Sequence, residues 1–427
     1  MTAGGAGRLL GEDDHALLLR LLRMPTAGPL ETGDGDAPLQ LWQAQHAYAE
    51  AAREVGMRVV HHAAPDPAVL LRPDVPAIVR AAAGPVFLAQ QPSLVLRLGA
   101  PALPVRDTVM FNVHLDTVSG TEPVGFDGER FTGRGAVDAK GPAVALLAGV
   151  RAAAAAHPGI GRDTAVVIQA VSGEEGGAMG TFGTRPLIEA GHVGRLNVFC
   201  EPTGLRHMPR ATASMTARIT VEGEDAIDDR PGAGHNATVL LGFLAQHLAA
   251  AGGSLCIAGL HTGHAHNRVY GTGQLLVNIP YATPAKGAAA ERLVEDAFTA
   301  GLKDFTDRFD KVPGFARTAA DAVAVTRLRW DKRGLPCLAR TEDPWGEDLL
   351  AAGGVPRQPD SEPAFTCDAI WMQDVPGTFT TVLGPGSLDA NHAHASGEFV
   401  DLADLEEFAD TVRRLLLAFA DQRETTT

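Results

Sequence analysis

The chain has 427 residues, which is long enough for two domains and a large core. Its 36 Lys and Arg residues against 51 Asp and Glu residues give a formal net charge of −15, which argues against nucleic acid or an anionic membrane as the main partner. The four cysteines form no Cys-X-X-Cys pair, so we expect neither a disulfide framework nor a cysteine-based zinc site, and a reduced, cytoplasmic setting fits best.

The first quarter of the chain predicts helices followed by strands. It begins without a basic segment that leads into an apolar core, and the sequence has no run of about 18 apolar residues, so we expect neither a secretory signal nor a membrane span. Helical spacing predicts helices over 13–22 and 38–55, with a loop rich in Pro, Gly and Asp between them. Short apolar runs then predict strands at 57–62, 93–98 and 108–113.

The third of these strands runs into His114-Leu115-Asp116. In an open α/β sheet such a strand end lies at the edge where ligands bind. His114 and Asp116 are two residues apart and therefore point the same way on an extended backbone, and a carboxylate behind an imidazole is the usual partner of a metal-ligating histidine. Most His-X-Asp triplets lie away from metals, so this motif needs support from the rest of the chain.

A glycine-rich loop supplies the next carboxylate. Gly133, Gly135 and Gly141 bracket Asp138, and small residues there allow the backbone to bring its carboxylate close to the same point. The alanine-rich residues 143–156 then predict a helix that can pack tightly on the sheet.

Two more predicted strands end in carboxylates. Residues 164–172 lead into Glu174-Glu175, and residues 196–200 lead into Glu201. Adjacent carboxylates are costly unless something positive lies between them. Any one of these residues could instead cap a helix or lie in a solvated loop. Because parallel strands end at one edge of a sheet, their joint occurrence predicts a single site.

Residues 214–333 change character and interrupt this sheet. They predict a β-α-β-β-α-β unit of the split βαβ type. The strands are expected at 214–223, 254–263, 270–282 and 321–330, and the helices at 234–252 and 288–309. We therefore predict an α/β catalytic domain with an open, mostly parallel sheet flanked by helices, formed by residues 1–213 and 334–427, with an inserted α+β, ferredoxin-like lid domain at 214–333.

The last segment returns to the catalytic sheet. It predicts a helix near 345–352, a strand at 378–383 and a final helix over 402–421. The loop before the final helix carries His394, followed four residues later by Glu398. Nitrogen and oxygen donors without thiolate suit zinc, cobalt or manganese, and five ligands with one bridging carboxylate suit two metals about 3.5 Å apart.

The ordered set HLDTV, GRGAVDAKGP, SGEEGG, the strand ending in Glu201-Pro202, and GPGSLDANHAHASGE resembles the two-metal amidohydrolase family of aminoacylase, acetylornithine deacetylase, succinyl-diaminopimelate desuccinylase and glutamate carboxypeptidase. The similarity covers nearly the whole chain. It implies hydrolysis of an amide bond in an N-acyl amino acid or small peptide by a metal-activated water. It also implies two divalent metal ions, with zinc as first choice, and a homodimer formed through the lid domain.

The resemblance also implies residue roles. Asp116 would orient His114, and Glu174 would be the base that activates water and then protonates the leaving amine. His394 is preferred to His392 because the family's final histidine precedes a glutamate by four residues; His392 is the alternative. The metal ligands would be His114, Asp138 and Glu201 for one ion, and Asp138, Glu175 and His394 for the other.

Further matches concern the substrate. Asn267 stands where the family has a substrate-contacting asparagine, and residues 366–369 resemble a small-residue loop near the family's site. The arginine usual at the end of the third lid strand is missing, so Arg268 or Arg230 are the candidates for a substrate carboxylate. An exposed arginine is more often only solvated.

The chain departs from the family in the lid. The family's histidine, which stabilises the oxyanion in a partner subunit's site, is replaced by Ile227-Asp228-Asp229. Losing one such donor costs about a hundred- to a thousand-fold in rate. Either another group substitutes, or the metal site performs other chemistry, such as forming or rearranging an amide in a specialised biosynthetic pathway. A non-catalytic binding module is a third possibility, which the intact Glu174 disfavours. The candidates to replace the missing lid histidine are His235, His264 and His266, each of which could equally be a surface or core histidine without a catalytic role.

A second departure lies in the catalytic domain. Gly173 stands where the family usually has an aspartate before its paired glutamates.

Overall fold

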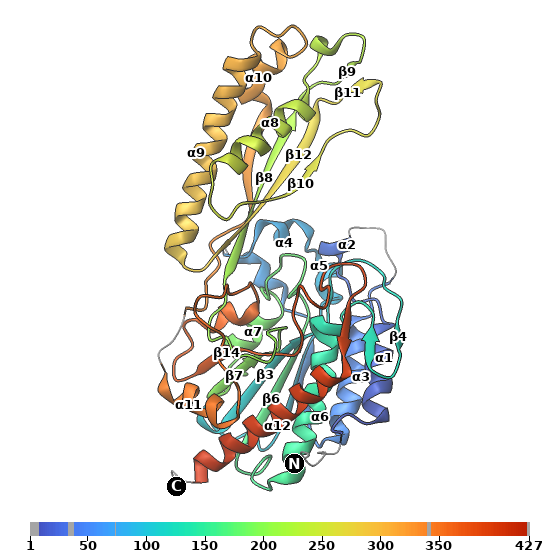
Figure 1. The fold of residues 1–427 in the computed structure, drawn as a ribbon, viewed down its shortest axis with the longest axis vertical. Helices are drawn as coiled ribbons and strands as arrows, with labels where there is room; N and C mark the ends of the chain where they lie inside the picture. The colour runs from blue at the N-terminus through green and yellow to red at the C-terminus, as the bar shows by residue number, and fades with distance from the viewer. Residues whose placement is uncertain (1–7, 33–37, 73, 340–342, 425–427) are drawn as a thin grey trace, which may run out of the picture. The chain divides into compact units, whose positions relative to one another are not determined.

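The computed structural model describes residues 8–32, 38–72, 74–339 and 343–424 (Figure 1). The chain divides into two compact units. The catalytic unit comprises residues 1–75, 79–211 and 338–427, and the lid unit comprises residues 76–78 and 212–337. The sequence placed the lid at 214–333; the lid unit in the structure spans 212–337 and also includes residues 76–78. No helix among the described residues is long and apolar enough to cross a membrane.

A six-stranded sheet forms the centre of the catalytic unit, in the order β1-β2-β6-β3-β7-β14. The pairs β6–β3, β3–β7 and β7–β14 are parallel, and β1–β2 and β2–β6 are antiparallel. The mostly parallel sheet predicted from the sequence is thereby confirmed, and within it β2 runs opposite to the other five strands. The strands are β1 (Arg58–Ala63), β2 (Ser93–Leu98), β3 (Thr108–His114), β6 (Ala165–Val171), β7 (Leu196–Phe199) and β14 (Phe379–Val382).

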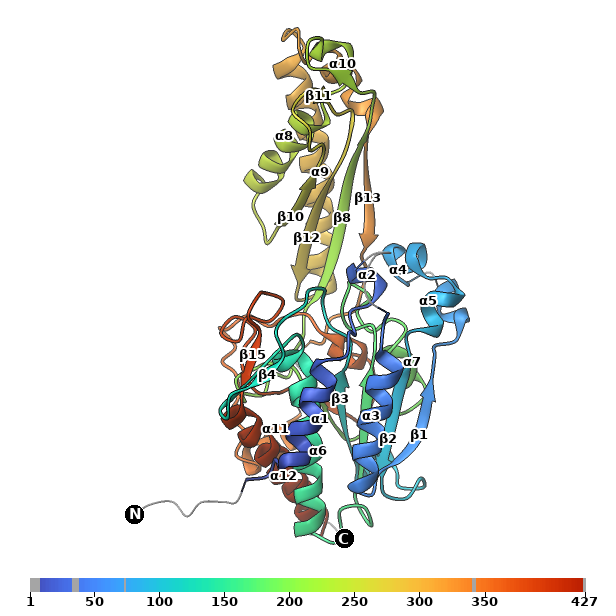
Figure 2. The same cartoon turned by 90° about the vertical axis from the view of Figure 1, so that its right-hand side faces the viewer.

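Helices cover the two faces of this sheet (Figure 2). Every residue of β3 is buried, as expected for a strand covered on both sides. Val109, Phe111 and Val113 join the core formed with α1, α3, α6 and α12. Asn112 points to the opposite face, where its Nδ2 donates to Oγ1 of Thr184 on α7. These helices are α1 (Glu12–Leu22), α3 (Leu41–Glu54), α6 (Gly141–Ala156), α7 (Thr184–Glu189) and α12 (Leu402–Glu424).

Short elements complete the catalytic unit. They include the helices α2 (Pro29–Thr32), α4 (Ala77–Ala82, of which only residues 79–82 belong to this unit), α5 (Pro85–Ala89) and α11 (Pro344–Ala352), and the 3-10 turns η1 (Pro67–Leu71), η2 (Val105–Asp107) and η5 (Asp368–Met372). Between Asp116 and Asp138 the chain contributes two strands to a small sheet, ordered β15-β5-β4. Its strands are β4 (Gly125–Phe126), β5 (Arg130–Thr132) and β15 (Phe399–Asp401).

The lid unit has a four-stranded antiparallel sheet in the order β10-β12-β8-β13, the order of a ferredoxin-like fold. One expectation is wrong here: residues 321–330 are not one strand, because α10 continues to Val325 and the strand begins at Thr326. The strands are β8 (Ala213–Glu222), β10 (Cys256–His261), β12 (Thr272–Tyr281) and β13 (Thr326–Lys332), with a separate pair β9 (Ala226–Ile227) and β11 (Arg268–Val269). The helices are α8 (Ala237–Ala250), α9 (Pro284–Phe309) and α10 (Ala316–Val325), with the 3-10 turn η4 (Pro231–Ala233).

The catalytic unit closes on itself where the lid unit interrupts it. The amide of Ala211 donates to the carbonyl of Leu338 at 3.0 Å, and the amide of Leu338 donates to the carbonyl of Ala211 at 3.1 Å. The two chain segments that lead into and out of the lid are therefore joined within the catalytic unit.

Candidate metal centre

The site begins with His114, the last residue of β3 and 1% exposed. Its Nδ1 lies 2.9 Å from the backbone carbonyl of Asp116. A carbonyl oxygen only accepts hydrogen bonds, so Nδ1 carries the proton in this contact and Nε2 is available as a metal ligand. Nε2 faces the acidic side chains of the site, 2.8 Å from Oδ1 of Asp138 and 3.9 Å from Oε1 of Glu201.

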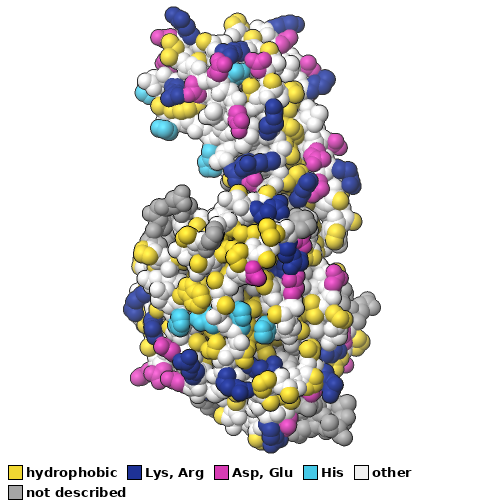
Figure 3. Space-filling model, turned by 180° about the vertical axis from the view of Figure 1, so that it is seen from behind, with side chains coloured by type: hydrophobic (Ala, Val, Ile, Leu, Met, Phe, Trp, Pro, Cys, Tyr) yellow, Lys and Arg dark blue, Asp and Glu magenta, His cyan; other side chains and the backbone are white. Residues whose placement is uncertain are grey.

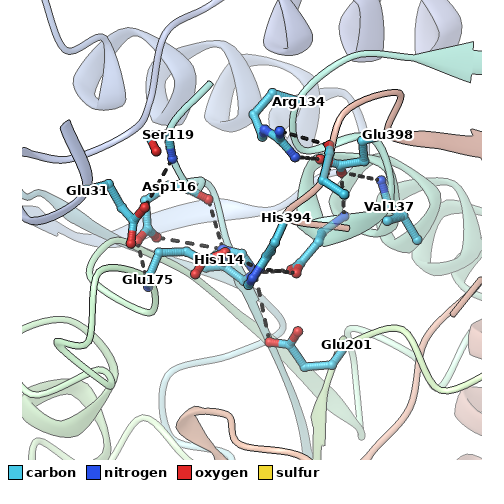
Figure 4. A network of polar contacts seen from close by, with 12 residues as sticks. Glu31, His114, Asp116, Ser119, Arg134, Val137, Glu175, Glu201, His394 and Glu398 are labelled. Atoms are coloured by element: carbon cyan, nitrogen blue, oxygen red, sulfur yellow. Dashed lines mark hydrogen bonds and ion pairs between the residues drawn. The ribbon is translucent and has the colours of Figure 1, made fainter. Parts of the chain in front are cut away.

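Asp138 contacts both predicted histidine ligands, and Figure 4 labels these histidines, His114 and His394. Its Oδ1 is bonded to Nε2 of His114, and its Oδ2 lies 3.1 Å from Nε2 of His394. Nε2 of His394 also lies 3.0 Å from Oε1 of Glu175. One carboxylate oxygen thus faces each histidine, which is the geometry that a carboxylate bridging two ions needs. His392, the alternative to His394, is exposed like His394, and its ring lies beside Phe399.

Burial and the charges of neighbouring groups shift the pKa values of the carboxylates in the site. Burial, together with the charges of Glu201 and Glu175, raises the pKa of Glu174 well above its usual value. Burial likewise raises the pKa of Glu175 to about 6 and that of Glu201 to about 8. Hydrogen bonds to Asp138 and Glu175 raise the pKa of His394 to about 11. Such shifts are those of an acidic cluster that cations would stabilise.

The donor atoms fit divalent metal ions. Three groups of side chains each bring their ligand atoms within 4.8 Å of one another, and all of these groups are drawn from the residues predicted from the sequence. The groups are His114, Asp138 and Glu201; His114, Glu174 and Glu175; and Asp138, Glu175 and His394.

The role expected of Asp116 needs a correction. Its backbone carbonyl, and not its carboxylate, bonds Nδ1 of His114, because the nearest carboxylate oxygen, Oδ1, lies 3.8 Å away. The carboxylate instead accepts the backbone N–H of Glu175 through Oδ2 at 3.0 Å. Asp116 therefore fixes His114 and the Glu175 loop at the same time.

Two residues that support the site, Glu398 and Arg134, were not identified from the sequence. Glu398, 1% exposed, accepts the backbone N–H groups of Val137 at 3.1 Å and Asp138 at 3.3 Å. It also accepts a hydrogen bond from Nη1 of Arg134 at 2.7 Å. Glu398 served only as a marker for His394 in the sequence, and nothing in the sequence indicates a bond across 264 residues.

The 366–369 loop carries another buried carboxylate beside the site. Asp368 is fully buried, and its Oδ2 accepts the hydroxyl of Thr184 at 2.5 Å. Its charge is one of those that raise the pKa values of Glu174 and Glu201. This loop was predicted to lie near the site, but the contact with α7 was not.

The predicted lid residues all belong to the lid unit. Asn267 is exposed, and Arg268 pairs with Asp225. Ile227 is 56% exposed. His235 is buried: its Nδ1 accepts the backbone N–H of Glu224 at 2.8 Å, and its Nε2 lies 3.1 Å from Asp321. Both ring nitrogens of His235 are thus engaged within the lid. His264, His266 and Arg230 are exposed.

Solved structures share the fold over nearly the whole chain. A metallo-carboxypeptidase of the M20 family from Sulfolobus solfataricus is 12% identical, with a TM-score of 0.66, and the match covers 96% of this chain and 100% of that one. The dipeptidase Dug1p from Saccharomyces cerevisiae is 15% identical, with a TM-score of 0.65 and 96% of both chains covered. A dinuclear metal-binding M20 peptidase from Bacillus subtilis is 11% identical, with a TM-score of 0.56; 95% of this chain and 97% of that one are covered.

A sequence relative from Aeropyrum pernix, named for the hydrolysis of [LysW]-lysine and [LysW]-ornithine, is 37% identical over 110 residues. That match covers 26% of this chain and 29% of the relative. The model of peptidase family M20/M25/M40 matches residues 110–418, which include all five proposed metal ligands. With that span of the sequence accounted for, the protein belongs to peptidase family M20/M25/M40 and is a hydrolase of that family.

Proposed function

We propose that the protein hydrolyses the amide bond of an N-acyl amino acid or a small peptide with two divalent metal ions. The observation that carries this proposal is the position of Asp138, with one carboxylate oxygen on each of the two histidines. Membership of a peptidase family supports hydrolysis of amide bonds as the class of reaction.

The chain supplies a complete set of ligands for two ions. His114, Asp138 and Glu201 would hold one ion, and Asp138, Glu175 and His394 would hold the other. Nitrogen and oxygen donors without thiolate favour zinc, with cobalt and manganese as alternatives. When bound, the ions would lower the pKa of the attacking water and polarise the amide carbonyl.

Glu174 is the residue left for acid and base chemistry. It is adjacent to a metal ligand, and burial raises its pKa, so it can accept a proton from the attacking water and hold it. Glu174 then delivers this proton to the leaving amine. Asp116 keeps His114 and the Glu174-Glu175 loop in register through the two hydrogen bonds described above.

The test measures release of free amine by protein loaded with zinc or cobalt. The panel contains N-acetyl and N-succinyl amino acids and dipeptides, with amides of lysine and ornithine added because of the name of the Aeropyrum relative. Glu174→Ala should lower kcat by about a hundred- to ten-thousand-fold while the metal content stays at the wild-type level. Glu129→Ala, at an exposed position, is the control. If wild type and Glu174→Ala were equally inert on the whole panel, hydrolysis would be excluded.

The lid favours one alternative chemistry. Ile227 cannot donate to an oxyanion, and His235 uses both ring nitrogens inside the lid. The same metal site would then form or rearrange an amide in a specialised biosynthetic pathway. Rapid hydrolysis of simple acyl amino acids would reject this alternative, whereas amide formation from an acyl donor and an amine would establish it.

The assembly, the location and the lid contacts complete the proposal. We expect a cytoplasmic homodimer formed through the lid unit, with Asn267 and Arg268 contacting the substrate. Arg268 would have to exchange its partner Asp225 for a substrate carboxylate. Sedimentation velocity distinguishes a dimer from a monomer, and Arg268→Ala should raise KM more than it lowers kcat.

A further inference from the structure

A small cavity lies beside the metal ligands in the catalytic unit, and the reaction proposed above gives it no task. Its volume is about 10 Å³, which is room for one water-sized group. Glu175, one of the proposed metal ligands, forms part of its wall. Whatever occupies the cavity is therefore next to the reacting centre.

Two residues of the wall each carry a buried polar atom that has no hydrogen-bond partner among the described residues. These atoms are Nε2 of Gln91, a residue 2% exposed, and Oδ1 of Asp116, a residue 3% exposed. Buried polar groups are almost always paired, so these two indicate a missing polar partner. A half-turn of the amide lets Gln91 present its oxygen to the cavity in place of its nitrogen.

Glu31 adds a carboxylate to the same wall. It is half-buried, and its Oε2 accepts the backbone N–H of Ser119 at 3.2 Å (Figure 4). In the part of the chain that the structure describes, Glu31 takes part in no ion pair within 4.0 Å. The adjacent Leu30 packs against Gly176, where an added Cβ would lie 2.6 Å from Cβ of Leu30, so α2 is held against the loop of the catalytic glutamates.

The remaining wall is apolar and aromatic. Phe87 and Phe182 line the cavity and form a T-shaped pair with ring centroids 5.5 Å apart. Aromatic rings favour cations over anions in their neighbourhood. Acceptors from Glu31, Asp116 and Gln91 beside two rings make up the surroundings that a small cation prefers.

We propose that this cavity binds a primary ammonium group of the substrate. Each of its three N–H groups would donate one hydrogen bond, to Glu31, to Asp116 Oδ1 and to the amide oxygen of Gln91. An ammonium group carries three donors and is about as large as a water molecule, so both its valence and its size match the cavity. This inference rests on the proposed function, and it narrows the substrate class to amides of amine-bearing amino acids or peptides with a free amino terminus.

The experiment compares three substrates of the zinc-loaded enzyme. N-acetyl-norleucine is the parent; N-acetyl-lysine adds an ammonium group on the side chain, and glycyl-norleucine adds one on the acyl side. At least one of the two should exceed the parent in kcat/KM by about tenfold or more. Glu31→Gln should reduce that ratio by about tenfold, and Glu129→Gln, at an exposed position, should leave it unchanged. The substrate that responds identifies which ammonium group is bound.

Two results would overturn the inference. In one, neither ammonium-bearing substrate is preferred; in the other, Glu31→Gln leaves the ratios at their wild-type values. If none of the three substrates were cleaved, the failure would belong to the proposed function. Calorimetry with butylammonium would then decide, because equal affinity for metal-loaded wild type and for Glu31→Gln would reject the cavity as its site.

Discussion

A Cβ atom at Gly173 would lie 2.2 Å from Cε2 of Phe182, so the two residues fit together only because Gly173 has no side chain. Gly173 also has φ +79°, a conformation that other residues adopt at a cost. The family's usual aspartate could not occupy this position while Phe182 stays where it is. The glycine at position 173 and the position of the Phe182 ring therefore depend on each other.

We predict that Gly173→Ala lowers the free energy of unfolding by about 2–4 kcal/mol, through overpacking and the positive φ. Gly191→Ala is the matched control, because Gly191 has φ +84° and nothing within 4 Å of an added Cβ. Adding Phe182→Ala to Gly173→Ala should cost less than the two single changes together. Denaturant unfolding measures all four variants, and additive costs would contradict the proposed packing conflict.

Glu398→Gln is predicted to weaken metal binding by about ten- to a hundredfold without removing a ligand. The carboxylate holds the backbone of Val137 and Asp138 and neutralises Arg134, so its loss lets the Asp138 loop move. Glu122→Gln is the control, since that carboxylate lies 3.8 Å from Arg134. Competition with a chromophoric chelator gives the affinities, and equal effects of the two substitutions would contradict a special role for Glu398.

Metal binding should release protons, and the apparent affinity should rise with pH. The pKa of His394 is raised to about 11 and that of Glu201 to about 8, so in the absence of metal both groups hold protons at neutral pH. Ligation needs a neutral imidazole and a carboxylate, so these protons must leave. Calorimetry in buffers of different ionisation enthalpy counts them. An affinity that is the same at pH 6 and pH 8 would show that the ligands are already deprotonated.

A group of histidines outside the site should make stability depend on pH. Figure 3 shows histidine side chains gathered on one face, and the rings of His46 and His62 lie 4.8 Å apart. Burial and then the charges of His46 and His61 lower the pKa of His62 to about 4. The folded state therefore binds this proton less readily than the unfolded state, in which the histidine has its ordinary pKa of 6.5.

The stabilisation from a neutral His62 is fully present above pH 6.5 and is lost progressively as the pH falls towards about 4. Replacing His62 by Gln should flatten the decline of the unfolding midpoint over this range, and His264→Gln, on the exposed lid loop, should leave it as in wild type. Urea unfolding at several pH values between 4 and 7 measures the slope. An unchanged slope in His62→Gln would assign the decline to other groups.

The central strands and the ligands at their ends could be predicted from the sequence, because these features depend on neighbouring residues in the chain. A buried parallel strand reads as an apolar run, and the ligand follows where the run stops, as at His114 and Glu201. The ligand atoms of His114, Asp138 and Glu201 do converge in the structure. Whether these residues bind metal remains a prediction.

What the sequence could not supply depends on contacts between distant segments or on the backbone. The backbone carbonyl of Asp116, and not its carboxylate, orients His114. A sequence pattern cannot show which of these two groups makes the contact. In the lid, the alternating Ala and Val residues of 321–325 resemble a strand. Tertiary packing favours a helix there, because a helix brings Thr318, Ala319 and Ala322 onto one buried face of α10.

The pair of hydrogen bonds between Ala211 and Leu338 has a consequence for the architecture as a whole. Topologically, the entire lid is a loop of a β-bridge, and its length adds only slowly to the entropy of closing that loop. The catalytic unit could therefore be reconnected by a tight turn in place of residues 212–337 and still assemble its metal ligands, all of which come from outside that stretch. Insertion at such a point leaves the catalytic unit free to keep its fold while the inserted unit varies, and in this chain Ile227, where the resemblance would place an oxyanion histidine, lies in the inserted unit.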